Sequence, residues 1–156
     1  MEKKILLAID DSENAQRAVK FVAKIFTTDS HITLFNVIPD TIALCEMNSP
    51  ELTPYFISQQ SSFCLLEEKK KELVNQAIDK AKEILLEAGF EENNITIKSE
   101  VKKSGVARDI VNEAKSGYSA IVMGRRGLSG IKDFILGSVS HKVFNAAKDV
   151  SILVVN

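Results

Sequence analysis

The chain alternates between short apolar runs and longer amphipathic stretches, and this alternation limits its fold more than any other feature. The apolar runs are typical of buried strands and cover residues 4–9, 31–38, 95–101, 119–123 and 151–155. The stretches between them predict helices over 12–27, over 65–88, from a cap at Ser104, and from Gly137-Ser138. Strands that alternate with helices form parallel sheets with helices on both faces. The sequence therefore predicts a three-layer α/β/α fold.

Apolar residues recur at three- and four-residue spacing in the two longest helical stretches. The helix over 12–27 is predicted to start at a cap formed by Asp11 or Ser12, whose side-chain oxygens accept from free first-turn N–H groups. The charged helix over 65–88 is predicted to end before Gly89, which tolerates a positive φ. Its predicted buried stripe consists of Leu66, Leu73, Ala77, Ile78, Ala81, Ile84 and Leu85.

One long segment, residues 39–62, shows no regular period. It contains all three prolines of the chain and many Ser, Thr and Asn residues, so a long loop is predicted. Loops of this length in compact domains are usually lids, partner surfaces or disordered segments. The segment also carries several large apolar residues, so we expect it to be partly ordered, against a protein partner as one alternative.

Length and charge exclude several classes of protein. A chain of 156 residues predicts one domain over 1–156. Its 20 Lys and Arg residues nearly balance 21 Asp and Glu residues, which argues against nucleic acid as a partner. No run reaches the roughly 18 apolar residues of a membrane span. The first apolar run stops at Asp10, too early for a signal peptide, so a cytoplasmic location is predicted.

The two cysteines, Cys45 and Cys64, have no histidine near them in the sequence. Cysteines in a reducing cytoplasm are usually free thiols, and free thiols are predicted here. A bridge between the two cysteines across the 39–62 segment is the alternative. No metal site is predicted from these residues.

A glycine-rich stretch follows the fourth predicted strand. Gly124, Gly127 and Gly130 permit close approach of a ligand to the backbone, and Gly137-Ser138 then opens a helix whose N-terminus favours an anion. This combination suits a polyphosphate, although glycines after a strand can also simply form a turn. The stretch is neither a Walker loop, because no Gly-Lys-[Ser/Thr] ends it, nor a dinucleotide fingerprint, because no Gly-x-Gly opens it.

The pattern Gly-x2-Gly-x9-Gly-[Ser/Thr], formed by Gly124, Gly127, Gly137 and Ser138, resembles that of the ATP-binding branch of the universal stress protein family. The segments KILLAIDDSENAQRAV, LFNVI and SILVVN resemble the first, second and last strands of that family. The resemblance covers essentially the whole chain. It implies a Rossmann-like fold of the adenine nucleotide alpha hydrolase type, with a five-stranded parallel sheet in the order 3-2-1-4-5.

The resemblance also implies a site for ATP, or for AMP or ADP, with Mg²⁺. Adenosine would lie at the ends of the first two strands, and the phosphates would lie at the glycine loop and the last helix. The matching positions are Ala8 and Asp10 for adenosine, Val37 for the adenine edge, Met123, Gly124, Arg126 and Gly127 for the ribose and phosphates, and Gly137, Ser138 and Val139 for the phosphates.

Three readings of individual residues stay open beside that site. Many family members carry a small or hydroxyl residue where this chain has Arg125, which could contact a phosphate, point to solvent or crowd the loop. Asp10 could serve only as a helix cap. The charge run over 67–72 predicts the solvent-exposed face of its helix.

Three functions follow from this pattern. A nucleotide-binding regulatory protein in the stress response is favoured, because no Glu or Gln in the glycine loop is placed to activate water and no catalytic residue is predicted. A slow ATPase and a nucleotide-free dimeric interaction module are the alternatives. A homodimer through the apolar last strand, 151–155, is predicted, since a bare apolar edge invites pairing. The sequence names neither a stress signal nor a protein partner.

Overall fold

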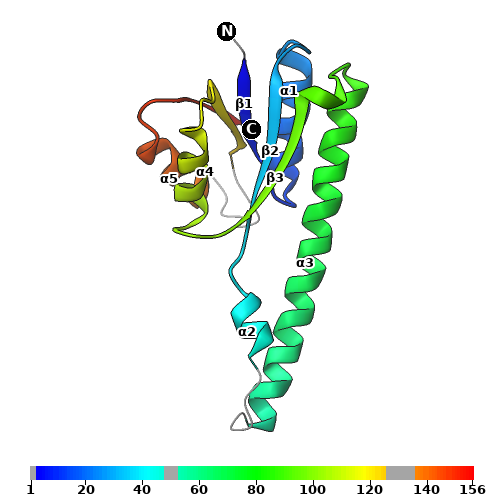
Figure 1. Cartoon of the computed structure of the whole chain (residues 1–156), viewed down its shortest axis with the longest axis vertical. Coiled ribbons are helices and arrows are strands. Elements are labelled where there is room, and N and C mark those ends of the chain that lie inside the picture. Colours follow the sequence, from blue (N-terminus) through cyan, green and yellow to red (C-terminus); the bar gives the residue numbers. More distant parts are fainter. Residues whose placement is uncertain (1–2, 48–52, 126–135) are drawn as a thin grey trace.

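The computed structural model describes residues 3–47, 53–125 and 136–156 (Figure 1). Five strands form one sheet, in which every neighbouring pair is parallel, in the order β3-β2-β1-β4-β5. The strands are β1 (Lys4–Ala8), β2 (His31–Ile38), β3 (Ile95–Val101), β4 (Ala120–Gly124) and β5 (Ser151–Val155). The predicted fold class and strand order are confirmed.

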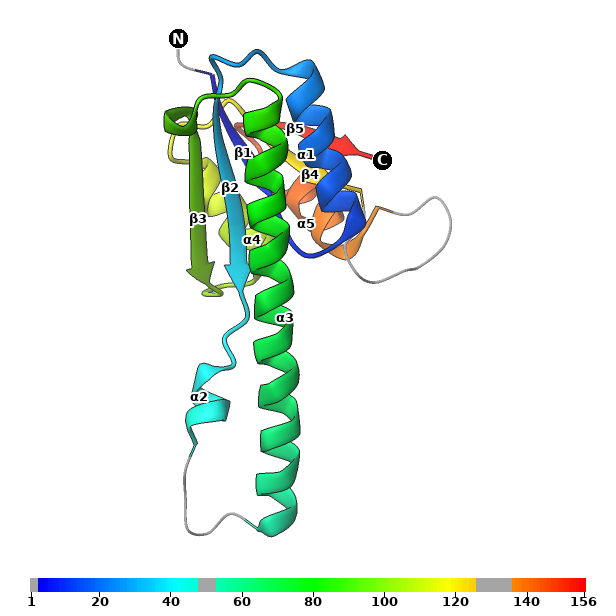
Figure 2. The same cartoon turned by 90° about the vertical axis from the view of Figure 1, so that its right-hand side faces the viewer.

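Helices cover both faces of the sheet. Within the described ranges these are α1 (Glu13–Ile25) and α3 (Pro54–Glu87) on one face, and α4 (Val106–Ala114) and α5 (Ser138–Ala146) on the other (Figure 2). Alternate residues of β1 divide between the two layers. Leu7 packs in the cluster that contains α1 and α3, and Leu6 in the cluster that contains α4 and α5. Both side chains are fully buried, which explains why β1 is a continuous apolar run.

Two predicted helix ends are confirmed. Ser12 is the N-cap of α1, and its hydroxyl oxygen accepts from the N–H of Ala15 at 3.1 Å. At the other end of the long helix, Gly89 has a φ of +95°, which a residue with a side chain rarely adopts. These two residues set where the chain enters α1 and leaves α3, and hence how both helices lie on the sheet.

The start of α4 differs from the prediction. Ser104 does not cap this helix, because Gly105, with a φ of +129°, occupies the N-cap position and makes no side-chain cap bond. Instead the carboxylate of Asp109 accepts from the backbone N–H groups of Lys103 at 2.8 Å and Ser104 at 3.0 Å. These bonds hold the pKa of Asp109 below its usual range. Asp109 therefore ties the chain that precedes α4 to the first turn of the helix, whereas a capping serine would accept from the N–H groups of that first turn.

The segment predicted to be irregular contains two helices, α2 (Ile42–Glu46) and the first turns of α3. Thr53 caps α3, and its hydroxyl oxygen accepts from the N–H of Phe56 at 3.3 Å. Pro54 lies in the first turn, where a missing N–H costs nothing. Proline and threonine, which the sequence analysis interpreted as loop residues, here mark the beginning of a helix.

The N-terminal half of α3 extends well beyond the sheet, with α2 beside it (Figures 1 and 2). Leu66 is 67% exposed and Leu73 is 45% exposed, so their prediction as buried residues was wrong. No sheet lies beneath the helix at Leu66 (Figure 2), and Leu73 does not face the core although its neighbour Val74 packs against it. Ile78 and Leu85 do reach the core and are buried. Among the described helices, including α3, none has both the length and the apolar composition needed to cross a bilayer.

Gly124, the last residue of β4, lies against the beginning of α1. A Cβ added at this position would lie 2.6 Å from the carbonyl carbon of Asn14 and 2.7 Å from its oxygen. Both atoms belong to the backbone and cannot rotate away. The close approach of β4 to α1 therefore requires glycine here, independently of any ligand.

We expect Gly124→Ala to lower the free energy of unfolding by roughly 1–3 kcal/mol, because the added methyl group forces the two backbones apart. Urea denaturation followed by circular dichroism measures this change as a lower midpoint. Ser116→Ala, at an exposed position, is the control and should shift stability by less than about 0.5 kcal/mol. An unchanged midpoint for Gly124→Ala would contradict the close approach.

Candidate functional site

A cavity of about 560 Å³ opens at the carboxyl ends of β1, β2 and β4, and each of the five α-helices that the structure describes contributes lining residues. Its volume lies in the usual range for small-molecule sites, about 300–1,000 Å³. In open α/β sheets ligands bind at this end of the strands, where the direction of the connections switches. Six of the residues predicted to bind nucleotide line it, namely Ala8, Asp10, Val37, Met123, Gly124 and Val139.

Of the other four predicted residues, two are described and do not line the cavity. Gly137 is the N-cap of α5, and Ser138 is the first residue of that helix and is exposed. Arg126 and Gly127 lie outside the described residues. The sequence therefore places part of the predicted phosphate site in a segment about which the structure says nothing.

Hydrogen bonds hold the start of α5 against the end of β4. The N–H of Gly137 donates to the carbonyl oxygen of Arg125 at 2.8 Å. The hydroxyl of Ser140, which is 3% exposed, donates to the carbonyl oxygens of Gly124 at 3.1 Å and Arg125 at 2.9 Å. Ser140 also lines the cavity and was not predicted from the sequence. These bonds fix the first turn of α5, whose N–H groups have no partner within a helix, beside the cavity.

Two carboxylates lie where β1 runs into α1. One oxygen of Asp10 accepts from both the backbone N–H, at 2.9 Å, and the hydroxyl of Ser12. Asp10 therefore supports the capping residue and is not itself the cap. Oδ1 of Asp11 is buried and has no hydrogen-bond partner among the described residues, although Asp11 lines the cavity. A buried acceptor without a donor costs free energy, so a donor from a ligand would be stabilised here.

The backbone of Val37 is oriented toward the gap beyond β1. The carbonyl oxygen of Phe35 accepts from the N–H of Ile9 at 2.9 Å, so Phe35 presents its peptide groups to β1. The carbonyl oxygen of Ile38 accepts from Lys102 at 2.7 Å and faces β3. Because peptide groups alternate along a strand, Val37 presents its N–H and C=O to the same side as Phe35, just past the end of β1.

Helix α3 provides a wall of the cavity that the sequence analysis missed. Val74 and Asn75 line the cavity one turn before the buried Ile78. Four residues of the charge run 67–72 also line it, namely Glu67, Glu68, Lys70 and Lys71. The run is largely exposed, as predicted, but it also forms the rim of the cavity. This role of the run depends on where α3 lies relative to the carboxyl end of the sheet. No local sequence pattern specifies that position.

The side chain of Arg125 points toward the end of β5. Its guanidinium donates to Oδ1 of Asn156 at 3.1 Å, and its backbone N–H donates to the carbonyl oxygen of Val155 at 2.7 Å. Arg125 is not among the lining residues, so the structure does not place a phosphate contact there. Within the part of the chain that the structure describes, no group of three or more His, Cys, Asp and Glu residues could hold a metal ion.

Cys45 and Cys64 form a disulfide, so the prediction of free thiols was wrong. The reason is the early start of α3, which places Cys64 on a helix that runs beside α2 instead of in a loop. The Cα atoms of the two cysteines lie 5.8 Å apart. Both residues line the cavity.

Comparison with known proteins gives one consistent result. The model of the universal stress protein family matches residues 1–156. The universal stress protein YxiE of Bacillus subtilis is 32% identical over 150 residues, which cover 92% of this chain and 92% of YxiE. A universal stress protein of Mycolicibacterium smegmatis is 27% identical over 96% of this chain, but the chain spans only 47% of that relative's length.

Solved structures share the fold along nearly the whole chain. The protein MJ0577 superposes with a TM-score of 0.68 at 27% identity, covering 99% of this chain and 96% of its own. A universal stress protein solved in complex with cAMP superposes with a TM-score of 0.58 at 18% identity, covering 99% of this chain and 97% of its own. At this low sequence identity, the similarity to the cAMP complex supports a shared fold only.

Proposed function

This chain belongs to the universal stress protein family, and on that premise we propose that it binds an adenine nucleotide in the cavity and acts as a nucleotide-dependent regulatory protein. The observation that carries the proposal is the pair of Val37 peptide groups that face the cavity past the end of β1. A donor and an acceptor from the backbone of one residue suit an adenine edge. The cAMP complex of a protein with this fold adds that the fold can hold such a ligand.

In this proposal the nucleotide lies across the carboxyl ends of three strands. Adenine meets Val37 and Ala8, and the ribose hydroxyls donate to the carboxylates of Asp10 and Asp11. Phosphates lie beside Gly124 and the start of α5, where the helix dipole favours an anion. Two more residues of the glycine pattern, Arg126 and Gly127, and the hydroxyl of Ser138 complete the proposed phosphate site. Met123 and Val139 supply its apolar sides.

We propose ATP as the nucleotide, with AMP and ADP as alternatives, and Mg²⁺ as its counterion. Magnesium is usually held by one or two carboxylates together with substrate phosphates, and Asp10 and Asp11 both line the cavity. The unpartnered buried oxygen of Asp11 is the feature that fits a cation or a ligand donor. The ion would neutralise phosphate charge and so strengthen binding.

Acid extraction of the purified protein, followed by nucleotide chromatography, tests the proposal. An adenine nucleotide in the extract at a substantial fraction of one per chain is expected. An extract without nucleotide, from protein that also fails to bind added ATP, would favour the nucleotide-free interaction module instead.

Turnover of ATP is expected to be slow or absent. Of the lining residues only Glu46, Glu67 and Glu68 are glutamates, and they belong to α2 and α3, whereas the proposed phosphate end lies at β4 and α5. A phosphate-release assay should therefore stay below the ordinary enzyme range of about 1–1,000 per second. Release within that range would make the ATPase alternative the better description.

A cytoplasmic location and a homodimer through β5 complete the proposed description. The apolar last strand supports the proposed homodimer.

A further inference from the structure

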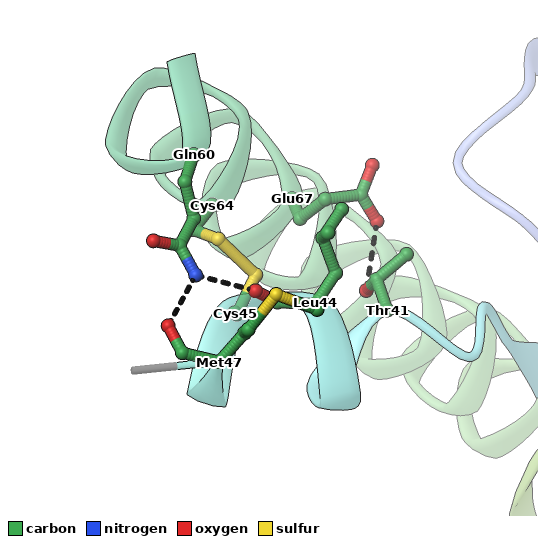
Figure 3. The surroundings of a disulfide bond; sticks show 7 residues. All are labelled: Thr41, Leu44, Cys45, Met47, Gln60, Cys64 and Glu67. Carbon is green, nitrogen blue, oxygen red and sulfur yellow. Dashed lines mark hydrogen bonds between the residues drawn. A yellow bond between two sulfur atoms is a disulfide. The ribbon is translucent and has the colours of Figure 1, made fainter. Parts of the chain in front are cut away.

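The Cys45–Cys64 disulfide joins the short helix α2 to α3 at the wall of the cavity (Figure 3). We propose that this disulfide is a redox switch for the nucleotide site. When oxidised, it holds α2 in place as part of the wall; when reduced, it releases α2 and weakens nucleotide binding. The inference rests on the proposed function and adds a mode of regulation to it.

Among the residues whose side chains the structure describes, three side-chain hydrogen bonds join α2 and its flanking residues to α3, and each is exposed or only partly buried. The side-chain amide of Gln60 donates to the carbonyl oxygens of Leu44 at 2.6 Å and Met47 at 2.9 Å. The hydroxyl of Thr41 donates to Glu67 at 3.4 Å, as Figure 3 also shows. Leu44 is 37% exposed and Met47 is 46% exposed, so neither contributes a buried contact. Hydrogen bonds that water can replace add little net stability, so the disulfide is the strongest constraint on α2 among these described contacts.

Helix α2 has five residues, far fewer than an isolated helix needs to be stable in water. It follows β2 after only a short connection, so its position decides where the chain runs just past Val37. Thr41, Cys45 and Glu46 line the cavity on this side. Release of α2 would therefore remove the wall next to the proposed adenine edge.

The proposed cytoplasmic location adds a second argument. Disulfides in a reducing cytoplasm are usually transient, catalytic or redox-sensing, because cellular thiols keep structural cysteines reduced. Both cysteines are only partly buried, so a thiolate can reach the sulfur atoms. A disulfide that is accessible and tied to a ligand cavity fits a sensor better than a permanent staple.

The reaction needs a dithiol as co-reactant. A thiolate of the dithiol attacks one Sγ, the Sγ–Sγ bond breaks, and a mixed disulfide forms. The second thiol of the reductant then displaces the remaining cysteine. The dithiol is oxidised to a disulfide, while Cys45 and Cys64 together gain two electrons and two protons.

The switch is tested on the full chain in two forms, oxidised and reduced with excess dithiothreitol. A thiol count should give two free thiols per reduced chain and none in the oxidised chain. Titration with ATP and Mg²⁺ should show about tenfold weaker binding to the reduced form, because the wall must then be ordered on binding. Hydrogen exchange should also become faster in α2, with β1 and β4 unchanged.

The Cys45→Ser/Cys64→Ser double variant serves as the matched control. It should bind ATP like the reduced form and should not respond to dithiothreitol. Equal affinity of the two wild-type forms, a disulfide that resists dithiothreitol in the folded protein, or unchanged exchange in α2 would each overturn the switch. If neither form binds ATP, the proposed function fails, and hydrogen exchange alone still decides whether the disulfide holds α2.

Discussion

Replacing both Gly127 and Gly137 with valine is expected to abolish ATP binding while the sheet stays folded. In the proposed site the phosphates approach the backbone at these glycines, and a branched side chain would occupy that space. Gly137 has a φ of −55° and a ψ of 157°, a conformation that valine adopts without strain. We therefore expect the affinity measured by calorimetry to fall by about a hundredfold or more, with little change in thermal stability.

The control for this double variant is Thr96→Val, a change to the same residue type at an exposed position of β3 away from the cavity. It should bind ATP like the unmodified protein. Circular dichroism of all three proteins separates lost binding from lost folding. Unchanged ATP affinity in the folded glycine variant would refute the assignment of the phosphate site.

Val154→Pro is expected to convert a homodimer to monomer. The strand β5 pairs with β4 on one side and lies at the edge of the sheet. The carbonyl oxygen of Val155 accepts from Arg125 and therefore faces β4. Because peptide groups alternate, the N–H of Val154 points to the open edge, where a second copy would pair. Proline removes this donor and leaves the bonds to β4 intact.

Light scattering at tens of micromolar checks this expectation. The unmodified protein should show twice the chain mass of 17.2 kDa, and the proline variant should show the chain mass alone. A monomeric unmodified protein would contradict the proposed dimer. A dimer that survives the substitution would move the contact away from β5, with residues 39–62 as the next candidate.

The strands of the sheet could be predicted because short segments of the sequence are enough to indicate each one. The run from Lys4 to Ala8 carries apolar residues on both faces, as is typical of a central parallel strand covered by helices on both sides. Ser12 follows this strand closely and is a residue type that commonly caps a helix. The order of the strands came from the resemblance to the family. Most of the predicted site residues that the structure describes lie at strand ends, and these could be located because the fold brings strand ends together.

The parts that could not be predicted depend on where a helix lies, not on whether it forms. Pro54 was interpreted as a loop residue because proline usually interrupts helices, but it lies in the first turn of α3. That longer helix brings Cys64 beside Cys45 and lays Val74 along the cavity. Leu66 matches the apolar period of the helix but lies beyond the sheet and is exposed. Periodicity shows which face is apolar, whereas burial depends on what lies opposite.

The central claim is that the cavity binds an adenine nucleotide, and a calorimetric titration of the nucleotide-stripped protein with ATP and Mg²⁺ tests it most directly. The account predicts saturable binding of one nucleotide per chain with a Kd of about 10 µM or below. The same titration with GTP should give markedly weaker binding, since a guanine edge presents a different donor and acceptor order to Val37. No saturable heat up to millimolar ATP would contradict the claim.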